Sequence, residues 1–200
     1  MVTWLVSMSH GQIGDVAEAP GIPTNGLDTN WYPHITVISM VETLNVNGAC
    51  GYTDKPVYGL ATAALSTVLF NNGYTCGACY EIAQYKTGIV PIKYRRVPCS
   101  RAGGIKFETK GNPYFLMILA YNVGGAGDIK AMQVKGSKTG WITMSRNWGQ
   151  NWSINAALTG QSLSLKVTTS DGITKVFNNV MQSNWGFGQT YDGKSNFYEK

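Results

Sequence analysis

From residue 104 onward, the chain alternates short runs of strand-forming residues with turn signals. In the clearest pair, 162–169 and 173–177, apolar and polar residues alternate on either side of Asp171-Gly172. An Asp-Gly pair between two such runs predicts a β-hairpin, because glycine accepts the positive φ that the tight turn requires. Further strand-like runs occupy 88–97, 104–109 and 114–121. Short strands with turn signals at this spacing predict an all-β chain with a β-sandwich of about 90 residues.

Two segments depart from this pattern. Residues 60–71 contain good helix formers, with Leu65, Val68 and Leu69 on one face, and they predict a helix that stops at Asn72-Gly73. Residues 1–33 are rich in Gly, Pro, Asp and Asn without periodicity, so a poorly specified leader without assigned structure is expected. No signal peptide is legible at its start, and no apolar run is long enough for an integral membrane segment.

The composition describes a folded globular chain, with 44% hydrophobic and 14% charged residues and a net charge of +5. The basic residues concentrate in 86–110, which holds seven of the 16 Lys and Arg residues. They lie in strand-like sequence and match no groove-reading helix, zinc finger or single-strand-binding signature, so no nucleic acid partner is expected. An acidic matrix polysaccharide would suit the same charge.

Three of the six tryptophans, Trp141, Trp148 and Trp152, lie close together among small and polar residues. Indole rings stack on the apolar faces of sugar rings, while Asn, Gln and Arg can bind the hydroxyls at the ring edges. The segment 140–152 therefore suggests polysaccharide binding. Burial of these rings in a hydrophobic core is the alternative.

All four cysteines, Cys50, Cys76, Cys79 and Cys99, lie in the first half of the chain. The spacing of Cys76 and Cys79 could supply half of a zinc site, but a structural four-cysteine site usually has a second close pair. Disulfides are favoured, and they indicate an oxidising, secreted compartment. No metal site and no cofactor are expected.

Several longer motifs of the chain are distinctive: Gly48–Tyr52, Ala61–Gly73, Cys76–Ile82, Tyr85–Pro91, Tyr94–Cys99, Asn122–Asp128 and Lys135–Trp152. Together they resemble one family, the plant α-expansins, over about 48–193. In that family the first domain is a double-psi β-barrel of endoglucanase type, and the second is an immunoglobulin-like β-sandwich that binds cellulose. The resemblance therefore implies this two-domain architecture.

The chain departs from the family between Ile82 and Ala83. At this point α-expansins carry a long Cys-rich stretch with a His-Phe-Asp motif, which supplies barrel strands and the family's key aspartate. Because barrel closure ties strand number, shear and tilt together, a truncated barrel remnant is expected at 34–103, followed by an intact sandwich at 112–193. In addition, Ile38 stands where the family has a groove tyrosine.

The resemblance also assigns roles to individual residues. It implies disulfides Cys50–Cys76 and Cys79–Cys99, and it places Tyr114 and Trp148 on one sheet face, where they would stack on glucose rings. Trp141, Trp152 and Trp185 are expected in the sandwich core. Arg146 and Lys135 are expected to be ordinary solvated charges.

No catalytic residue is expected. Glycoside hydrolysis needs two carboxyl groups across the scissile bond, and the first half offers little beyond Asp54 and Glu81, whose ordinary roles are a turn and an ion pair. His10 and His34 belong to no legible nucleophile arrangement.

Three functions remain open. The resemblance implies a secreted, monomeric plant cell-wall protein, not an enzyme, that loosens non-covalent contacts between cellulose and matrix glucans. A polysaccharide-binding module without loosening activity is the alternative, and a hydrolase is the third possibility. The missing His-Phe-Asp stretch discriminates the first two, and it predicts weak or absent loosening.

Overall fold

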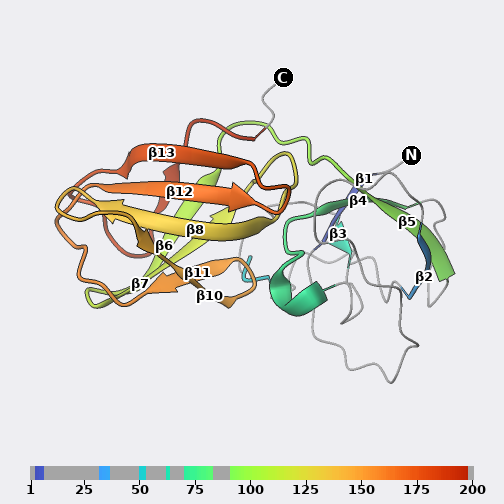
Figure 1. The fold of residues 1–200 in the computed structure, drawn as a ribbon, viewed down its shortest axis with the longest axis horizontal. Helices are drawn as coiled ribbons and strands as arrows, with labels where there is room; N and C mark the ends of the chain where they lie inside the picture. The colour runs from blue at the N-terminus through green and yellow to red at the C-terminus, as the bar shows by residue number, and fades with distance from the viewer. Residues whose placement is uncertain are drawn as a thin grey trace.

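A computed structural model describes residues 3–6, 32–36, 50–52, 62–63, 70–82 and 91–197. Their strands form three β-sheets of five, five and four strands. Figure 1 shows two of these sheets stacked as a sandwich at one end of the molecule and the third sheet at the other end. The helical element among the described residues is the 3-10 turn η1 (Asn71–Gly73). The all-β architecture predicted from the sequence is confirmed.

The first sheet has the strand order β2-β5-β4-β1-β3. Its neighbouring strands β4 and β5 are antiparallel, with Cys79 opposite Val97 and Glu81 opposite Arg95. The edges β2 and β3 do not pair with each other, so the described strands form an open sheet. The five strands are β1 (Thr3–Val6), β2 (Tyr32–Thr36), β3 (Thr62–Ala63), β4 (Cys79–Ile82) and β5 (Pro91–Val97).

Two sequence predictions fail in this sheet. The leader was expected to have no structure, but Thr3–Val6 forms β1, between β4 and β3. The start of the helix predicted over 60–71 is wrong, because Thr62–Ala63 forms β3, which pairs in parallel with β1. Phe70, near its predicted end, has helical backbone angles. Pairing in a sheet satisfies the backbone groups of both segments and outweighs their local preference. Leu65, Val68 and Leu69 lie outside the described residues.

The sandwich contains the other two sheets. One has the order β10-β11-β7-β6-β14 and the other has the order β13-β12-β8-β9. The strands of the first are β6 (Lys106–Asn112), β7 (Phe115–Tyr121), β10 (Ser145–Trp148), β11 (Asn151–Ile154) and β14 (Thr190–Asp192). Those of the second are β8 (Ile129–Gly136), β9 (Ile142–Thr143), β12 (Leu163–Thr169) and β13 (Thr174–Met181).

Sequence and structure agree closely on the hairpins of the sandwich. β12 and β13 are antiparallel and meet at the predicted turn, where Gly172 has a φ of 87°. β6 and β7 form a second hairpin, with Asn112 opposite Phe115. Because β6 is part of this sheet, the sandwich extends to the N-terminal side of the expected boundary at 112.

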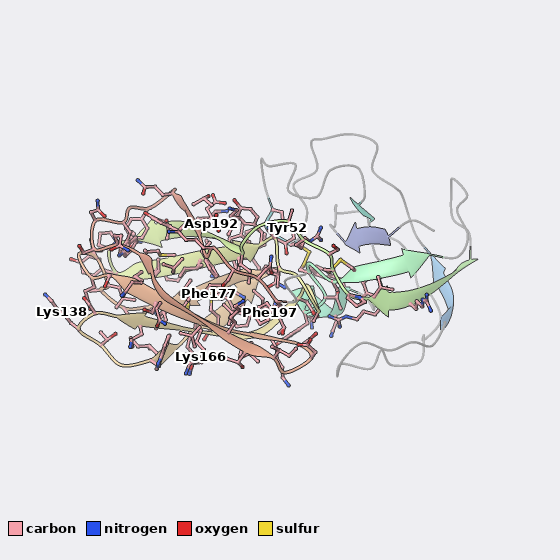
Figure 2. The ribbon with its side chains drawn as sticks, turned by 90° about the horizontal axis from the view of Figure 1, so that it is seen from above. Tyr52, Lys138, Lys166, Phe177, Asp192 and Phe197 are labelled. Carbon is pink, nitrogen blue, oxygen red and sulfur yellow. A yellow bond between two sulfur atoms is a disulfide. The ribbon has the colours of Figure 1, made fainter. Side chains whose placement is uncertain are left out.

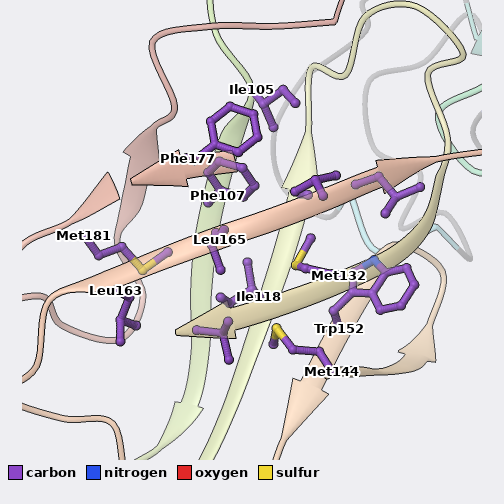
Figure 3. Close-up of a cluster of buried hydrophobic side chains, with 14 of the residues drawn as sticks. Ile105, Phe107, Ile118, Met132, Met144, Trp152, Leu163, Leu165, Phe177 and Met181 are labelled. Carbon is purple, nitrogen blue, oxygen red and sulfur yellow. The ribbon is translucent and has the colours of Figure 1, made fainter. Parts of the chain in front are cut away.

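The core of the sandwich follows from the alternation of residues along its strands. In β7, Leu116, Ile118 and Ala120 are buried between the sheets, while Phe115 and Met117 face outward and are half-buried. Figure 3 shows the central side chains, among which Phe107 and Phe177 meet edge to face with their ring centroids 5.1 Å apart. Trp152 and Trp185 are both buried here, as predicted.

A smaller hydrophobic cluster joins the sandwich to residues 50–52 and 70–76 from the first half of the chain. Leu119 on the outer face of β7 packs with Cys50, Tyr52 and Cys76, and the half-buried Phe70 and Tyr121 complete the cluster. Cys99 and Gly125 form an isolated antiparallel bridge beside it, with N–H to carbonyl distances of 2.7 and 3.1 Å. No helix in the described segments is long and apolar enough to span a membrane.

Candidate functional site

Two exposed aromatic rings belong to the sheet β10-β11-β7-β6-β14: Trp148 ends β10 on its outer face, and Tyr114 stands in the turn between β6 and β7. Tyr114 is 78% exposed, and Trp148 is 43% exposed. Phe115 and Met117 are half-buried on the same face, because they alternate with the core residues of β7. We call this surface, with Tyr114, Phe115, Met117 and Trp148, the aromatic face.

The β6–β7 turn presents Tyr114 to solvent. The side-chain oxygen of Asn112 accepts hydrogen bonds from the backbone N–H groups of Tyr114 (3.0 Å) and Phe115 (3.2 Å). This arrangement is an Asx turn, in which the side chain replaces a backbone acceptor and fixes the loop. The Tyr114 ring is therefore held outward from a rigid hairpin tip.

Trp148 lies at the other end of the same face. It ends β10 opposite Asn151, after an irregularity in the register between Arg146 and Trp148. Asn151 in turn lies opposite Leu119 of β7, five residues from Tyr114. At about 3.4 Å per strand residue and about 4.8 Å between strands, the Cα positions of the two residues are separated by about 20 Å. They mark the ends of a strip long enough for an extended chain of several sugar rings.

The indole of Trp148 rests on the backbone of Gly51. A Cβ atom at Gly51 would lie 3.1 Å from the six-membered part of the ring and would collide with the side-chain amide of Asn151. The same amide donates a hydrogen bond to the Trp148 carbonyl at 3.2 Å. One ring is thus braced by residues from both halves of the molecule.

Gln150, next to Trp148 in the hairpin, connects the sandwich to the Cys50–Cys76 disulfide. Its backbone N–H donates to the Cys50 carbonyl at 3.0 Å, and its side-chain amide donates to the Cys76 carbonyl at 2.6 Å. Gly149 packs so closely on Cys50 that a Cβ atom there would collide with the Cys50 backbone. The hairpin that carries Trp148 therefore cannot move independently of the disulfide.

Arg146 makes the most extensive set of contacts across this junction. Its guanidinium donates to the carbonyls of Gly73 (3.1 Å) and Gly149 (2.6 Å), and it also donates to the Ile129 carbonyl. The group lies 4.4 Å from the Tyr74 ring centroid and 4.6 Å from that of Trp152. Burial lowers the pKa of Arg146, whereas the nearby Tyr74 and Asp128 favour its charged form. The expectation of an ordinary solvated charge is wrong.

A buried ion pair forms a second connection. Arg96 of β5 pairs with Asp128, which lies just before β8, and also donates to the Ala126 carbonyl (3.0 Å) and the Ser170 hydroxyl (2.9 Å). Ser170 donates to the Asp128 carboxylate at 2.6 Å. Burial raises the pKa of Asp128, and the charge of Arg96 opposes this shift. Neither residue belongs to a sequence pattern that predicts this role.

Comparison with known proteins identifies the family. The family model for the expansin C-terminal domain matches residues 105–182. Expansin-A25 of Arabidopsis thaliana is 54% identical to the chain, and the alignment covers 98% of this chain and 94% of the relative. The chain belongs to the expansin family. Membership supports an expansin-type function in cell-wall loosening.

The length of that alignment agrees with a deletion in this expansin. The alignment extends over 262 positions, more than the 200 residues of the chain, so the relative carries residues that have no counterpart here. The resemblance of the motifs predicts that these residues are missing between Ile82 and Ala83.

Solved structures show the same fold at low sequence identity. The apo expansin of Clavibacter michiganensis superimposes with a TM-score of 0.69 and 16% identity, covering 86% of this chain and all of that one. A mutant of the same bacterial expansin, in complex with cellohexaose, gives a TM-score of 0.61 and 14% identity, covering 84% and 99% of the two chains.

One further sequence prediction needs correction in this expansin. Trp141 was expected in the core, but it is half-buried on the outer side of the other sheet, near the ammonium group of Lys135. The Nζ atom of Lys135 lies 5.3 Å from the centroid of this indole. Trp141 precedes β9, whose short length gave the sequence no alternation from which to assign its side.

The residues considered for catalysis contribute little to the described structure. Asp54 and His10 lie outside the described residues, as does Ile38. Glu81 and His34 lie on β4 and β2, and Glu81 is opposite Arg95 in the register. Within the described ranges, no three His, Cys, Asp or Glu residues gather as a metal site would require.

Proposed function

We propose that this expansin binds cellulose and matrix glucans through the aromatic face, with Tyr114 and Trp148 stacking on glucose rings. The observation that supports this proposal is the presence of two exposed aromatic rings on one sheet, Tyr114 in the β6–β7 turn and Trp148 at the end of β10, each held by its own turn. Flat apolar ring faces suit such contacts, because each buries apolar area without requiring a deep pocket. The complex of the bacterial expansin with cellohexaose supports a glucan as the ligand class.

The two parts of the chain would have different roles. Residues 112–193, together with β6, form the cellulose-binding sandwich, and residues 34–103 are a truncated remnant of the barrel domain. The protein acts as a monomer in the plant cell wall, after secretion. Its two disulfides suit an oxidising compartment.

Loosening is proposed to be non-hydrolytic and impaired. The chain lacks the His-Phe-Asp stretch that follows the position of Ile82 in the family, and its first sheet is open among the described strands. A groove that lacks strands and the family's key aspartate would hold a glucan weakly. The missing stretch also favours the alternative function, a polysaccharide-binding module without loosening activity.

Binding to insoluble cellulose tests the aromatic face directly. Trp148→Ala and Tyr114→Ala are each expected to weaken binding by about three- to tenfold, since an aromatic stacking contact contributes about 0.5–1.5 kcal/mol. Tyr114→Phe keeps the ring and should bind like the wild type. Unchanged binding in both alanine variants would refute the aromatic face as the site.

Wall creep, measured on the same preparations, separates the two functions. Binding without creep identifies a binding module with an inactive first domain. Creep at the level of a full-length α-expansin would show that the missing stretch is dispensable, and the proposal of impaired loosening would then be wrong.

A further inference from the structure

The other outer face of the sandwich has a different chemistry. β8 and β9 pair with Val134 opposite Ile142 and Gln133 opposite Thr143. Val134 is buried in the core, so Lys135 and Trp141 face outward, as do Gln133 and Thr143, whose side chains are 3.2 Å apart. We call the outer surface formed by Gln133, Lys135, Trp141, Thr143 and Lys166 the lysine face.

Two ammonium groups gather over one indole on this face. The Nζ atoms of Lys135 and Lys166 lie 5.3 and 4.6 Å from the ring centroid of Trp141. They are therefore within about one Debye length of each other at 0.1 M salt, which is about 10 Å. Contact with the ring holds both side chains in place by cation–π attraction, which reduces the entropy lost when an anion binds.

No carboxylate of the described residues forms an ion pair with Lys135 or Lys166. The acidic groups of the sandwich lie elsewhere. Asp128 pairs with Arg96, Asp192 with Lys106 and Glu108 with Lys110, and Asp171 lies in the β12–β13 turn. Figure 2 shows Lys166 and Asp192 on opposite sides of the sandwich. The lysine face is thus a cationic surface, and binding of an external anion would reduce the repulsion between the Lys135 and Lys166 ammonium groups.

We propose that the lysine face binds an acidic glycan of the wall matrix, a linear polyuronate with carboxylates on successive sugar rings. The ammonium groups of Lys135 and Lys166 would bind carboxylates, and the half-buried Trp141 would contact the apolar part of a ring. Gln133 and Thr143 add an amide and a hydroxyl for the sugar hydroxyls. Charge complementarity selects this occupant, because a neutral glucan would leave two adjacent positive charges uncompensated.

This site is separate from the aromatic face, which lies on the other sheet. One molecule could therefore hold a neutral glucan on one side of the sandwich and an acidic glycan on the other side. The proposal does not depend on the identity of the ligand at Tyr114 and Trp148.

Retention on immobilised polygalacturonate tests the proposal. The double variant Lys135→Gln/Lys166→Gln is expected to bind about tenfold more weakly, because two exposed charge contacts of up to about 1 kcal/mol each are lost. Its binding to cellulose should be unchanged, whereas Trp148→Ala should weaken cellulose binding and keep polygalacturonate binding. Because glutamine retains most of the lysine stem, the double lysine variant should unfold at the wild-type denaturant concentration.

A charge-matched control separates this site from a general effect of net charge. Lys110→Gln/Lys194→Gln removes two charges from the other sheet's side of the sandwich and should retain polygalacturonate binding within about twofold. Methyl-esterified polygalacturonate has the same backbone without the charge and should not bind. Equal losses in both double variants, equal binding of the esterified polymer or no binding by the wild type would each overturn the proposal.

Discussion

Arg146 and Tyr74 connect the two halves of the molecule through a stacked contact, with the guanidinium 4.4 Å from the ring centroid. Tyr74 follows η1, whereas Arg146 belongs to β10, the strand that ends at Trp148. The other side of the contact is Trp152, a core residue of the sandwich. The Arg146 guanidinium thus contacts both the exposed Tyr74 ring and the buried Trp152 ring. Because Arg146 and Trp148 belong to the same strand, these contacts help to fix the position of the exposed Trp148 indole.

Replacement of Arg146 should therefore lower stability substantially. Arg146→Ala leaves the carbonyls of Gly73, Gly149 and Ile129 without this donor. Hydrogen bonds to charged groups contribute about 1.5–3 kcal/mol each, so a loss of about 3 kcal/mol is expected after partial replacement by water. Arg146→Lys keeps the charge but not the planar fork, and it should recover less than half of this loss. Urea unfolding measures the stability of both variants. A wild-type midpoint for Arg146→Ala would show that the contacts of the Arg146 guanidinium do not stabilise the protein.

Gly51→Ala tests how far Trp148 depends on the first half of the chain. Gly51 has a φ of 86°, and its Cβ position is occupied by the Asn151 amide and the Trp148 ring. The substitution should move the indole and weaken cellulose binding about as much as Trp148→Ala does. The control is Gly160→Ala, which also has a positive φ but meets no atom within 4 Å of the added Cβ. If both alanine variants bind cellulose equally, backbone strain and not the contact with Trp148 is responsible.

The sequence predicted the strands and hairpins of the sandwich because alternation and turn signals are local. It placed Tyr114 and Trp148 through the resemblance, and the structure finds both rings exposed. It did not find the roles of Arg146, Gln150 or Asp128, since each depends on a partner more than 30 residues away or on a backbone carbonyl. β1 and β3 were missed for the same reason, as very short strands have no periodicity of their own and exist only through pairing.

The buried pair Arg96–Asp128 predicts a pH-dependent variant. Arg96→Met leaves the carboxylate buried without its cation and should cost about 3–5 kcal/mol at neutral pH. The pKa of Asp128, already raised by burial, should rise further. The folded state then keeps a proton that the unfolded chain has lost, so stability is full below the unfolded pKa near 3.8 and falls as the pH rises through the folded value.

Urea unfolding of Arg96→Met between about pH 4 and about pH 7 checks this sign. The variant should be closest to the wild type at the acidic end. Adding Asp128→Asn to Arg96→Met removes the titrating group, so the free energy of unfolding of this double variant should lose the pH dependence that Arg96→Met shows. A deficit of Arg96→Met that grows on acidification would contradict the assignment.

The two disulfides should differ in their effect on binding. Removal of either pair by alanine substitution should lower stability by about 2–4 kcal/mol, because the loops that they close, with separations of 26 and 20 residues, are similar in length. Only Cys50 and Cys76 present their carbonyls to Gln150, next to Trp148. Cys50→Ala/Cys76→Ala should therefore weaken cellulose binding even where the protein remains folded, while Cys79→Ala/Cys99→Ala should weaken it less.

Binding assays at a temperature below the unfolding transitions of both double variants compare their affinities for cellulose. Equal losses of affinity would show that the hydrogen bonds from Gln150 to Cys50 and Cys76 do not help to position the aromatic face.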